Sequence, residues 1–142
     1  MWGIVIALVS GALMSVQGVF NTEVTKGSSL WAANSWVQFT ALLVCIGAWF
    51  FTGRESMTAL FRIDQKYMLL GGVIGAFITL TVIQSMDALG PAQAVLLIVV
   101  SQIAVAYVIQ LFGWFGVEQT TLQWNKILGL VLSIGGIFIF QK

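Results

Sequence analysis

Side chains able to form hydrogen bonds recur at helical spacing inside hydrophobic segments of this 142-residue chain. Ser10, Met14, Gln17 and Asn21 are spaced four, three and four residues apart, which places them on one face of a helix. An amide in hydrocarbon is costly unless it is paired, so we expect such residues to face a bundle interior or a wet cavity. Later apolar segments contain further members of this set, namely Asn34, Gln38, Cys45, Thr81, Gln84, Ser101, Gln102, Tyr107 and Gln110.

Two interpretations of these polar residues stay open. They could be hydrogen-bonding contacts between helices, each worth on average about 0.6 kcal/mol in a membrane. They could instead line a polar cavity that binds a substrate. Four of the five long apolar segments contribute members, most of them within a turn or two of the segment centres. As a set, the residues therefore favour a cavity.

Ionisable and metal-binding side chains are scarce. The sequence has no histidine, and its one cysteine, Cys45, lies inside an apolar segment. No charged residue falls in the interior of a predicted span, and Glu23 and Asp87 lie next to span ends, where solvated helix-end charges are the simpler interpretation. Buried carboxylates are the usual proton or cation handles of transporters, so coupling through a buried Glu is not expected. We expect no catalytic residue, no metal site and no cofactor, and an enzyme is the least favoured class.

The composition of the chain indicates which secondary-structure elements contain the polar residues described above. The chain is 59% hydrophobic, and its 6 basic and 5 acidic residues give a net charge of +1 without a concentrated basic stretch, so nothing points to nucleic acid. Crossing a bilayer takes about 20 apolar residues of helix. Five uncharged runs have about that length, and they predict an integral membrane protein of five helices. The expected single transmembrane domain, residues 1–142, has spans at about 2–20, 30–51, 67–84, 92–114 and 124–140.

The ends of the predicted spans have recognisable signals. Trp31, Trp49 and Trp114 fall near ends, as interfacial aromatic residues do. Gly90 is suited to closing the third helix, and Pro91 to the first turn of the fourth. Asn21 is expected either to continue the polar face of the first helix or to cap its end.

Small residues form stripes on three of the predicted helices. In a membrane, a small residue at every fourth position lets two helices approach closely. The stripes are expected to serve packing within one protomer or against a second protomer, with the fifth helix favoured for the latter. The residues assigned to this role are Gly11, Gly18, Gly71, Gly75, Gly129, Ser133 and Gly136.

The basic residues favour one orientation in the membrane. Arg54, Arg62, Lys66 and Lys126 fall on the side of the amino terminus, whereas only two lysines, at positions 26 and 142, fall on the other side. Because positive loops stay in the cytoplasm, a cytoplasmic amino terminus is expected. The bias of four against two is modest, so dual topology stays open.

Three stretches of the sequence resemble one family. "GALMSVQGVFN" resembles the first-helix signature of the YdcZ-type bacterial inner-membrane proteins, a branch of the drug/metabolite transporter superfamily. "LLGGVIGAFITLTVIQSMDALGPAQAVLLIVVSQIAVAYVIQLFGWFG" resembles the central block of that family, and "NKILGLVLSIGGIFIF" its glycine-rich last helix. One departure is Ser101-Gln102, which stands where the family has a Gly-Gln pair; this change keeps the amide.

The resemblance implies a fold and an assembly. The chain would be half of a ten-helix transporter fold whose two halves are inverted repeats. An odd number of spans puts the two termini on opposite sides of the membrane, so two inverted halves require two oppositely inserted chains. The expected assembly is an antiparallel dimer in the inner membrane, with either a second copy or a related five-helix chain as the partner.

The resemblance also implies a function. The leading hypothesis is an exporter of small organic molecules that works by alternating access at a polar and aromatic cavity between protomers. A neutral or zwitterionic substrate, or a soft cation held by aromatic faces, is expected because no charge is buried. The alternatives are a non-transporting subunit that stabilises or regulates a partner and, less favoured, a small ion channel. The proposed substrate-binding residues are Gln17, Asn34, Gln38 and Gln102 for hydrogen bonding, and Trp31 and Tyr107 for aromatic surface.

Overall fold

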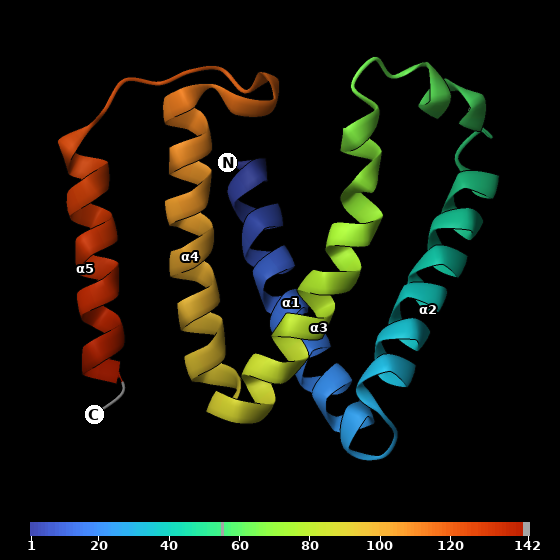
Figure 1. The fold of residues 1–142 in the computed structure, drawn as a ribbon, viewed down its shortest axis with the longest axis horizontal. Helices are drawn as coiled ribbons and strands as arrows, with labels where there is room; N and C mark the ends of the chain where they lie inside the picture. Colours follow the sequence, from blue (N-terminus) through green and yellow to red (C-terminus); the bar gives the residue numbers. More distant parts are fainter. Residues whose placement is uncertain (55, 141–142) are drawn as a thin grey trace. The chain divides into compact units, whose positions relative to one another are not determined.

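A computed structural model describes residues 1–54 and 56–140 and is all-helical over these residues. The described residues form five α-helices, and three short 3-10 helices lie in the connections between them (Figure 1). The elements are α1 (Trp2–Lys26), α2 (Leu30–Phe51), η1 (Met57–Arg62), η2 (Lys66–Leu70), α3 (Gly71–Leu89), α4 (Pro91–Phe112), η3 (Trp114–Gly116) and α5 (Trp124–Phe140).

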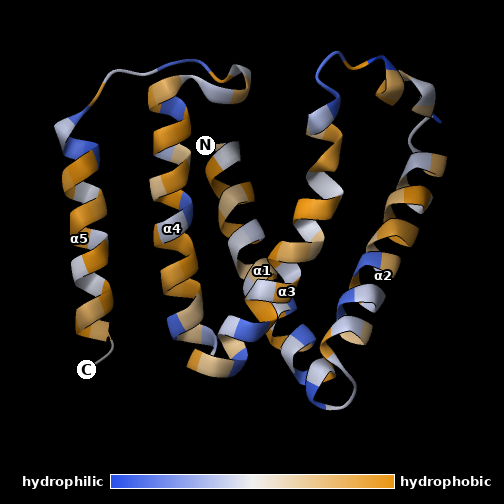
Figure 2. Ribbon diagram, viewed as in Figure 1, coloured by the Kyte–Doolittle hydropathy of each residue, from blue (hydrophilic) through white to orange (hydrophobic). Residues whose placement is uncertain are grey.

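Four of these helical segments are long and apolar enough to cross a membrane. They are α1, α2, α4 and the continuous stretch Lys66–Leu89, with 25, 22, 22 and 24 residues. The fifth apolar helix, α5, has 17 residues, at the lower end of what spans a hydrocarbon core. Most large apolar side chains on all five helices are exposed, and Figure 2 shows hydrophobic residues distributed around them. Such surfaces fit a lipid environment.

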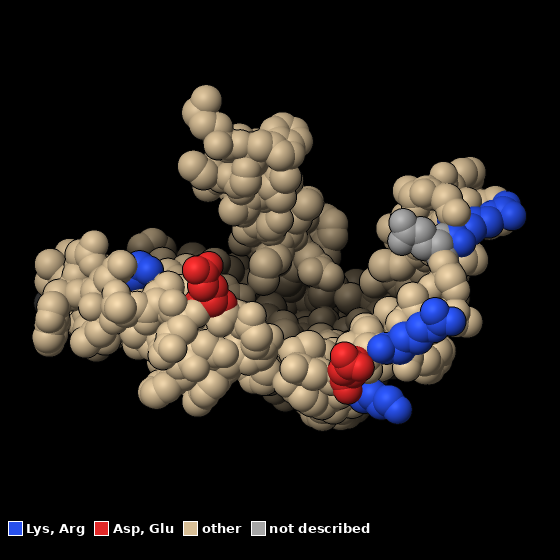
Figure 3. All heavy atoms as spheres, turned by 90° about the horizontal axis from the view of Figure 1, so that it is seen from above, with Lys and Arg blue, Asp and Glu red and all other residues tan. Residues whose placement is uncertain are grey.

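The chain divides into two compact units, residues 1–87 and residues 88–142, called here the N-terminal unit and the C-terminal unit. In the N-terminal unit, α1 and α2 are joined by a tight turn at residues 27–29. Ser29 caps α2, because its hydroxyl oxygen accepts the Ala32 N–H at 3.2 Å. A longer connection with η1 and η2 leads to α3, and Figure 3 shows the basic side chains gathered over it.

The core of the N-terminal unit lies where the end of α1, the start of α2 and the second half of α3 meet. Its position near one end of the helices leaves the rest of each helix exposed (Figure 1). Three of its buried members are polar, so this core depends on hydrogen bonds as well as on apolar contacts. The buried residues are Gly18, Asn21, Thr22, Ala33, Asn34, Ile83 and Met86.

The first helix is longer than its apolar run predicts. The expected end near Phe20 is wrong, because α1 continues to Lys26. Polar side chains do not stop a helix when they bond within it: the hydroxyls of Thr22 and Thr25 donate to carbonyls one turn earlier, at 2.9 and 2.8 Å. Asn21 therefore lies inside the helix, and the idea that it caps the end is wrong.

The third and fourth helices are displaced from their expected bounds. The α-helical part of the third begins at Gly71, after η2, and it continues to Leu89 instead of ending at Gln84. The fourth ends at Phe112, because Gly113 takes a left-handed conformation with φ of 63°. At the turn between them, Gly90 has φ of 80° and Pro91 occupies the first helical position, as expected.

In the C-terminal unit, α4 and α5 form an antiparallel hairpin, side by side in Figure 1. The connecting segment folds back on the last turn of α4. The Thr120 N–H donates to the Gln110 carbonyl at 3.0 Å, and the Gln119 side-chain amide donates to the Leu111 carbonyl at 2.9 Å. These bonds satisfy carbonyls that a helix end otherwise leaves open.

Candidate functional site: an uncharged groove between α1 and α2

A groove of about 530 Å³ lies between α1 and α2 in the N-terminal unit. A second hollow of about 500 Å³ adjoins it along α1 and shares Gln17, Phe20 and Asn21 with it. The whole predicted polar face of the first helix lines this second hollow, from Ser10 through Met14 to Asn21. From α2, the groove is lined by Trp36, Val37, Thr40, Ala41, Val44 and Cys45.

The lining of the groove contains no charged side chain. Its free hydrogen-bonding groups are the amides of Gln17 and Asn21, because the Thr40 hydroxyl already donates to carbonyls of its own helix at 3.0 Å. Phe20 and Trp36 add aromatic surface from opposite helices. This combination can orient a ligand through amide hydrogen bonds while burying its apolar part.

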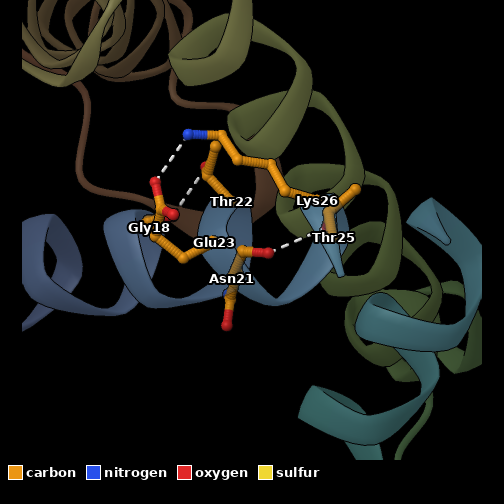
Figure 4. Close-up of polar contacts among 6 residues, drawn as sticks. All are labelled: Gly18, Asn21, Thr22, Glu23, Thr25 and Lys26. Carbon is orange, nitrogen blue, oxygen red and sulfur yellow. Dashed lines mark hydrogen bonds and ion pairs between the residues drawn. The ribbon is translucent and has the colours of Figure 1, made fainter. Parts of the chain in front are cut away.

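The charged side chains near the end of α1 pair with each other outside the groove. Glu23 and Lys26 form an exposed ion pair of 2.7 Å, one turn apart on the same helix. Figure 4 shows the Asn21 side chain pointing away from this pair. The Asn21 backbone carbonyl accepts the Thr25 hydroxyl, yet the residue as a whole is only 8% exposed. Its side-chain amide thus belongs to the groove rather than to the helix end.

Asn34 and Gln38 lie on another face of α2, against α3. The Asn34 amide nitrogen donates to the Ala76 carbonyl at 3.0 Å, and the Gln38 amide nitrogen donates to the Thr79 hydroxyl at 3.4 Å. The Asn34 side-chain oxygen is buried and has no hydrogen-bond partner within the described residues. These two amides therefore bridge helices, and one of them retains an open acceptor.

The remaining predicted site residues lie apart from this groove. Trp31 is 66% exposed near the start of α2. Gln102 and Tyr107 belong to α4 in the C-terminal unit, where Gln102 is exposed and the Tyr107 hydroxyl accepts the Gln123 N–H at 2.8 Å. Within the N-terminal unit, the structure places Asn34 and Gln38 on one face and Gln17 in the groove.

Three groove residues, Phe20, Trp36 and Thr40, were not among the site residues predicted from the sequence. Trp36 and Thr40 line the groove from α2 and are one helical turn apart. That spacing is visible in the sequence, but neither residue has an amide side chain and neither lies near a predicted span end. A helical wheel centred on Trp36 would have indicated this face.

Among the predicted packing residues, Gly18 has a close neighbour from another helix. A Cβ atom at Gly18 would lie 2.6 Å from the Met86 sulfur and 3.4 Å from a Val82 methyl carbon, so any other residue there would require the end of the Met86 side chain to shift. The Ser133 hydroxyl donates within α5, to the Gly129 carbonyl at 2.8 Å. The other glycines in the set, Gly11, Gly71, Gly75, Gly129 and Gly136, have open space at this position within the described chain.

A family model described as "Putative inner membrane exporter, YdcZ" matches residues 2–139, which is nearly the whole chain. The chain belongs to the YdcZ family. The resemblance noted from the sequence motifs is thereby confirmed, and this YdcZ-family member is a multi-pass inner-membrane protein of the transporter class. No curated protein and no solved structure gives a significant match. The groove of this YdcZ-family protein is accordingly considered below as a transport site.

Proposed function

We propose that this protein exports small, neutral or zwitterionic organic molecules, or soft cations, and that the α1–α2 groove contacts the substrate. The observation that carries the proposal is the uncharged lining of the groove, with two free amides and two aromatic rings in an otherwise apolar surface. A fixed charge in a membrane groove would select an oppositely charged ligand, whereas amides and rings accept neutral ones. Membership of an exporter family supports the direction of transport.

Within this proposal, the amides have different roles. Gln17 contacts the substrate directly, since it is exposed and lines the groove. Asn34 and Gln38 position α2 against α3. Trp31 and Gln102 remain proposed contributors from exposed positions. Tyr107 was expected to offer aromatic surface, but we do not include it, because the Lys126 ammonium lies over its ring, 5.5 Å from the centroid.

Alternating access requires two halves of opposite orientation, so we further propose an antiparallel dimer with a second copy or a related chain. The open space at Gly11 and Gly71 supports this, because these glycines have no close neighbour in their own described chain. Rocking of one half against the other would then expose the groove to each side in turn. Cross-linking of cysteine variants between oppositely inserted protomers would test the assembly.

Flux measurements in proteoliposomes test the transport proposal. The purified full chain is reconstituted, and a panel of labelled neutral, zwitterionic and cationic metabolites is screened against protein-free vesicles. Substrate-dependent flux for at least one member of the panel is expected. Flux indistinguishable from empty vesicles across the panel, together with stable co-purification of an unrelated protein, would overturn the proposal in favour of the non-transporting subunit.

The substitution Gln17→Leu tests the assigned site. Loss of one neutral hydrogen bond to the substrate is expected to lower flux about three- to tenfold. The matched control is Gln84→Leu, the same change at an exposed glutamine on α3 that does not line the groove. Equal flux in the two variants would show that Gln17 does not contact the substrate, even if transport itself were established.

A further inference from the structure

A second groove, of about 460 Å³, lies between α4 and α5 in the C-terminal unit. Unlike the α1–α2 groove, its lining includes a cation, Lys126. Gln110 lines the same end, and Ile103 and Leu130 provide apolar walls further along. The groove is therefore amphipathic along its length.

Lys126 has its ammonium group held over an aromatic ring. The nitrogen lies 5.5 Å from the centroid of the Tyr107 ring, and the Tyr107 hydroxyl is fixed in turn by the Gln123 N–H. Over the described residues, the one ion pair is Lys26–Glu23, so Lys126 lacks a carboxylate partner there. An anionic group can therefore bind to Lys126 without first breaking an existing ion pair.

Gln110 supplies neutral donors beside this cation. Its side-chain amide is exposed and has no hydrogen-bond partner within the described part of the chain. The positive end of the α5 macrodipole lies in the same turn as Lys126 and also favours negative charge. Lys126, Gln110 and this helix end thus place positive charge and hydrogen-bond donors at one end of the groove, called here the rim.

The length of the groove along α4 and α5 indicates whether an amphiphilic anion or a small anion fits it better. Because α4 and α5 are antiparallel, Ser133 and Ile103 lie further from the connecting segment than Lys126 and Gln110 do. Seven residues of helix separate Lys126 from Ser133, or about 10 Å. Beyond the rim the lining is mostly apolar, and the Ser133 hydroxyl already donates to its own helix. A free phosphate would fill the rim alone, whereas a lipid would fill both parts.

We propose that the α4–α5 groove is a binding site for an anionic phospholipid. The phosphate accepts hydrogen bonds from the Lys126 ammonium and the Gln110 amide, and one acyl chain lies between Ile103 and Leu130. Tryptophans at the same end of the hairpin, Trp114 and Trp124, are exposed and suited to the headgroup level. Basic pockets between membrane helices are a recognised way to bind such headgroups. Its lining shares no residue with that of the proposed transport groove.

Native mass spectrometry of the purified full chain in detergent tests this site. The probes are dioleoyl phosphatidylglycerol and dioleoyl phosphatidylcholine, which differ in headgroup charge and share their acyl chains. Preferential retention of the anionic lipid is expected. The substitution Lys126→Gln should weaken that preference about fivefold, whereas Lys66→Gln, at an exposed lysine in η2, should leave it unchanged.

Filling the apolar part of the groove tests the acyl-chain contact with the charge intact. Gly129→Leu points into open space, so folding is expected to persist while retention of both lipids falls. Millimolar inorganic phosphate should not displace the anionic lipid, and displacement would reduce the site to an anion-binding rim. Equal retention of the two lipids, or equal loss in Lys126→Gln and Lys66→Gln, would overturn the proposal. None of these readouts depends on transport.

Discussion

The α1–α2 groove and the α4–α5 groove both lie between predominantly apolar helices, and they differ in where they carry polar groups. Between α1 and α2, amides line an uncharged groove from Gln17 to Asn21. Between α4 and α5, Lys126 and Gln110 are concentrated at one end and apolar walls follow. Distributed neutral polarity suits a substrate that must bind and leave, whereas polarity at one end suits a molecule that is itself amphipathic. The presence of one charged side chain, Lys126, in only one of the two linings is therefore the basis for proposing different ligands for the two grooves.

The two units are also held together differently. In the N-terminal unit, α3 contacts other helices directly, through the Met86 side chain against Gly18 and through the backbone carbonyl of Ala76, which accepts a hydrogen bond from Asn34. In the C-terminal unit, the segment after α4 returns to bond the last turn of that helix, with Gly113 starting the turn. Close packing should make the first unit sensitive to added volume. Backbone geometry should make the second sensitive at its turn.

The largest expected effect comes from adding volume at Gly18. Gly18→Leu should lower the free energy of unfolding in detergent by about 1–3 kcal/mol, because the new side chain overlaps Met86, which is itself only 3% exposed. Gly129→Leu in the C-terminal unit is the matched change and should be nearly neutral. Partial rescue of Gly18→Leu by Met86→Ala would identify the overlap as the cause. A loss of equal size in both glycine variants would contradict the difference between the units.

A smaller effect is expected at the turn of the C-terminal unit. Gly113→Ala should cost about 1–2 kcal/mol, because φ of 63° is unfavourable for a residue with a Cβ atom. Space is also limited, since that atom would lie 3.3 Å from the Cβ of Gln119. The control is Gly47→Ala in the middle of α2, where helix propensity predicts no loss. Unfolding titrations measure the free energy of unfolding of both variants. Equal values would show that the turn at Gly113 does not stabilise this unit.

The smallest expected effect is at Asn34. It distinguishes a residue that stabilises the fold from a residue that contacts the substrate. Asn34→Leu removes the bond to the Ala76 carbonyl but also removes a buried oxygen without a partner, so the net loss should stay within about 0.6 kcal/mol. Gln17→Leu should show the opposite pattern, with unchanged unfolding and reduced flux. A loss above about 2 kcal/mol for Asn34→Leu would mean that its unpartnered oxygen is not a cost.

Much of the helical architecture could be predicted from the sequence. Uncharged runs of about 20 residues have few alternatives to a membrane helix, and α2 and α5 begin and end at the expected residues. The ends of helices were harder to predict where polar residues continue a helix, as in α1 beyond Phe20. Local hydrogen bonds, rather than hydropathy, determine where such a helix ends. The 3-10 segment η2 before α3 gave no separate signal, since its residues continue the same apolar run.

The sequence by itself determined the class, the family motifs and the scarcity of ionisable groups in the spans, because these follow from composition and order alone. It also placed Ser10, Met14, Gln17 and Asn21 on one face, since helical periodicity fixes that relation. Only the tertiary structure decided which helix each face meets. It turned Asn34 toward α3, set Gly18 against Met86 and put Tyr107 beneath Lys126. The physical reason is that a hydrophobic helix can pack in lipid on any side, and only contacts distant in sequence select one.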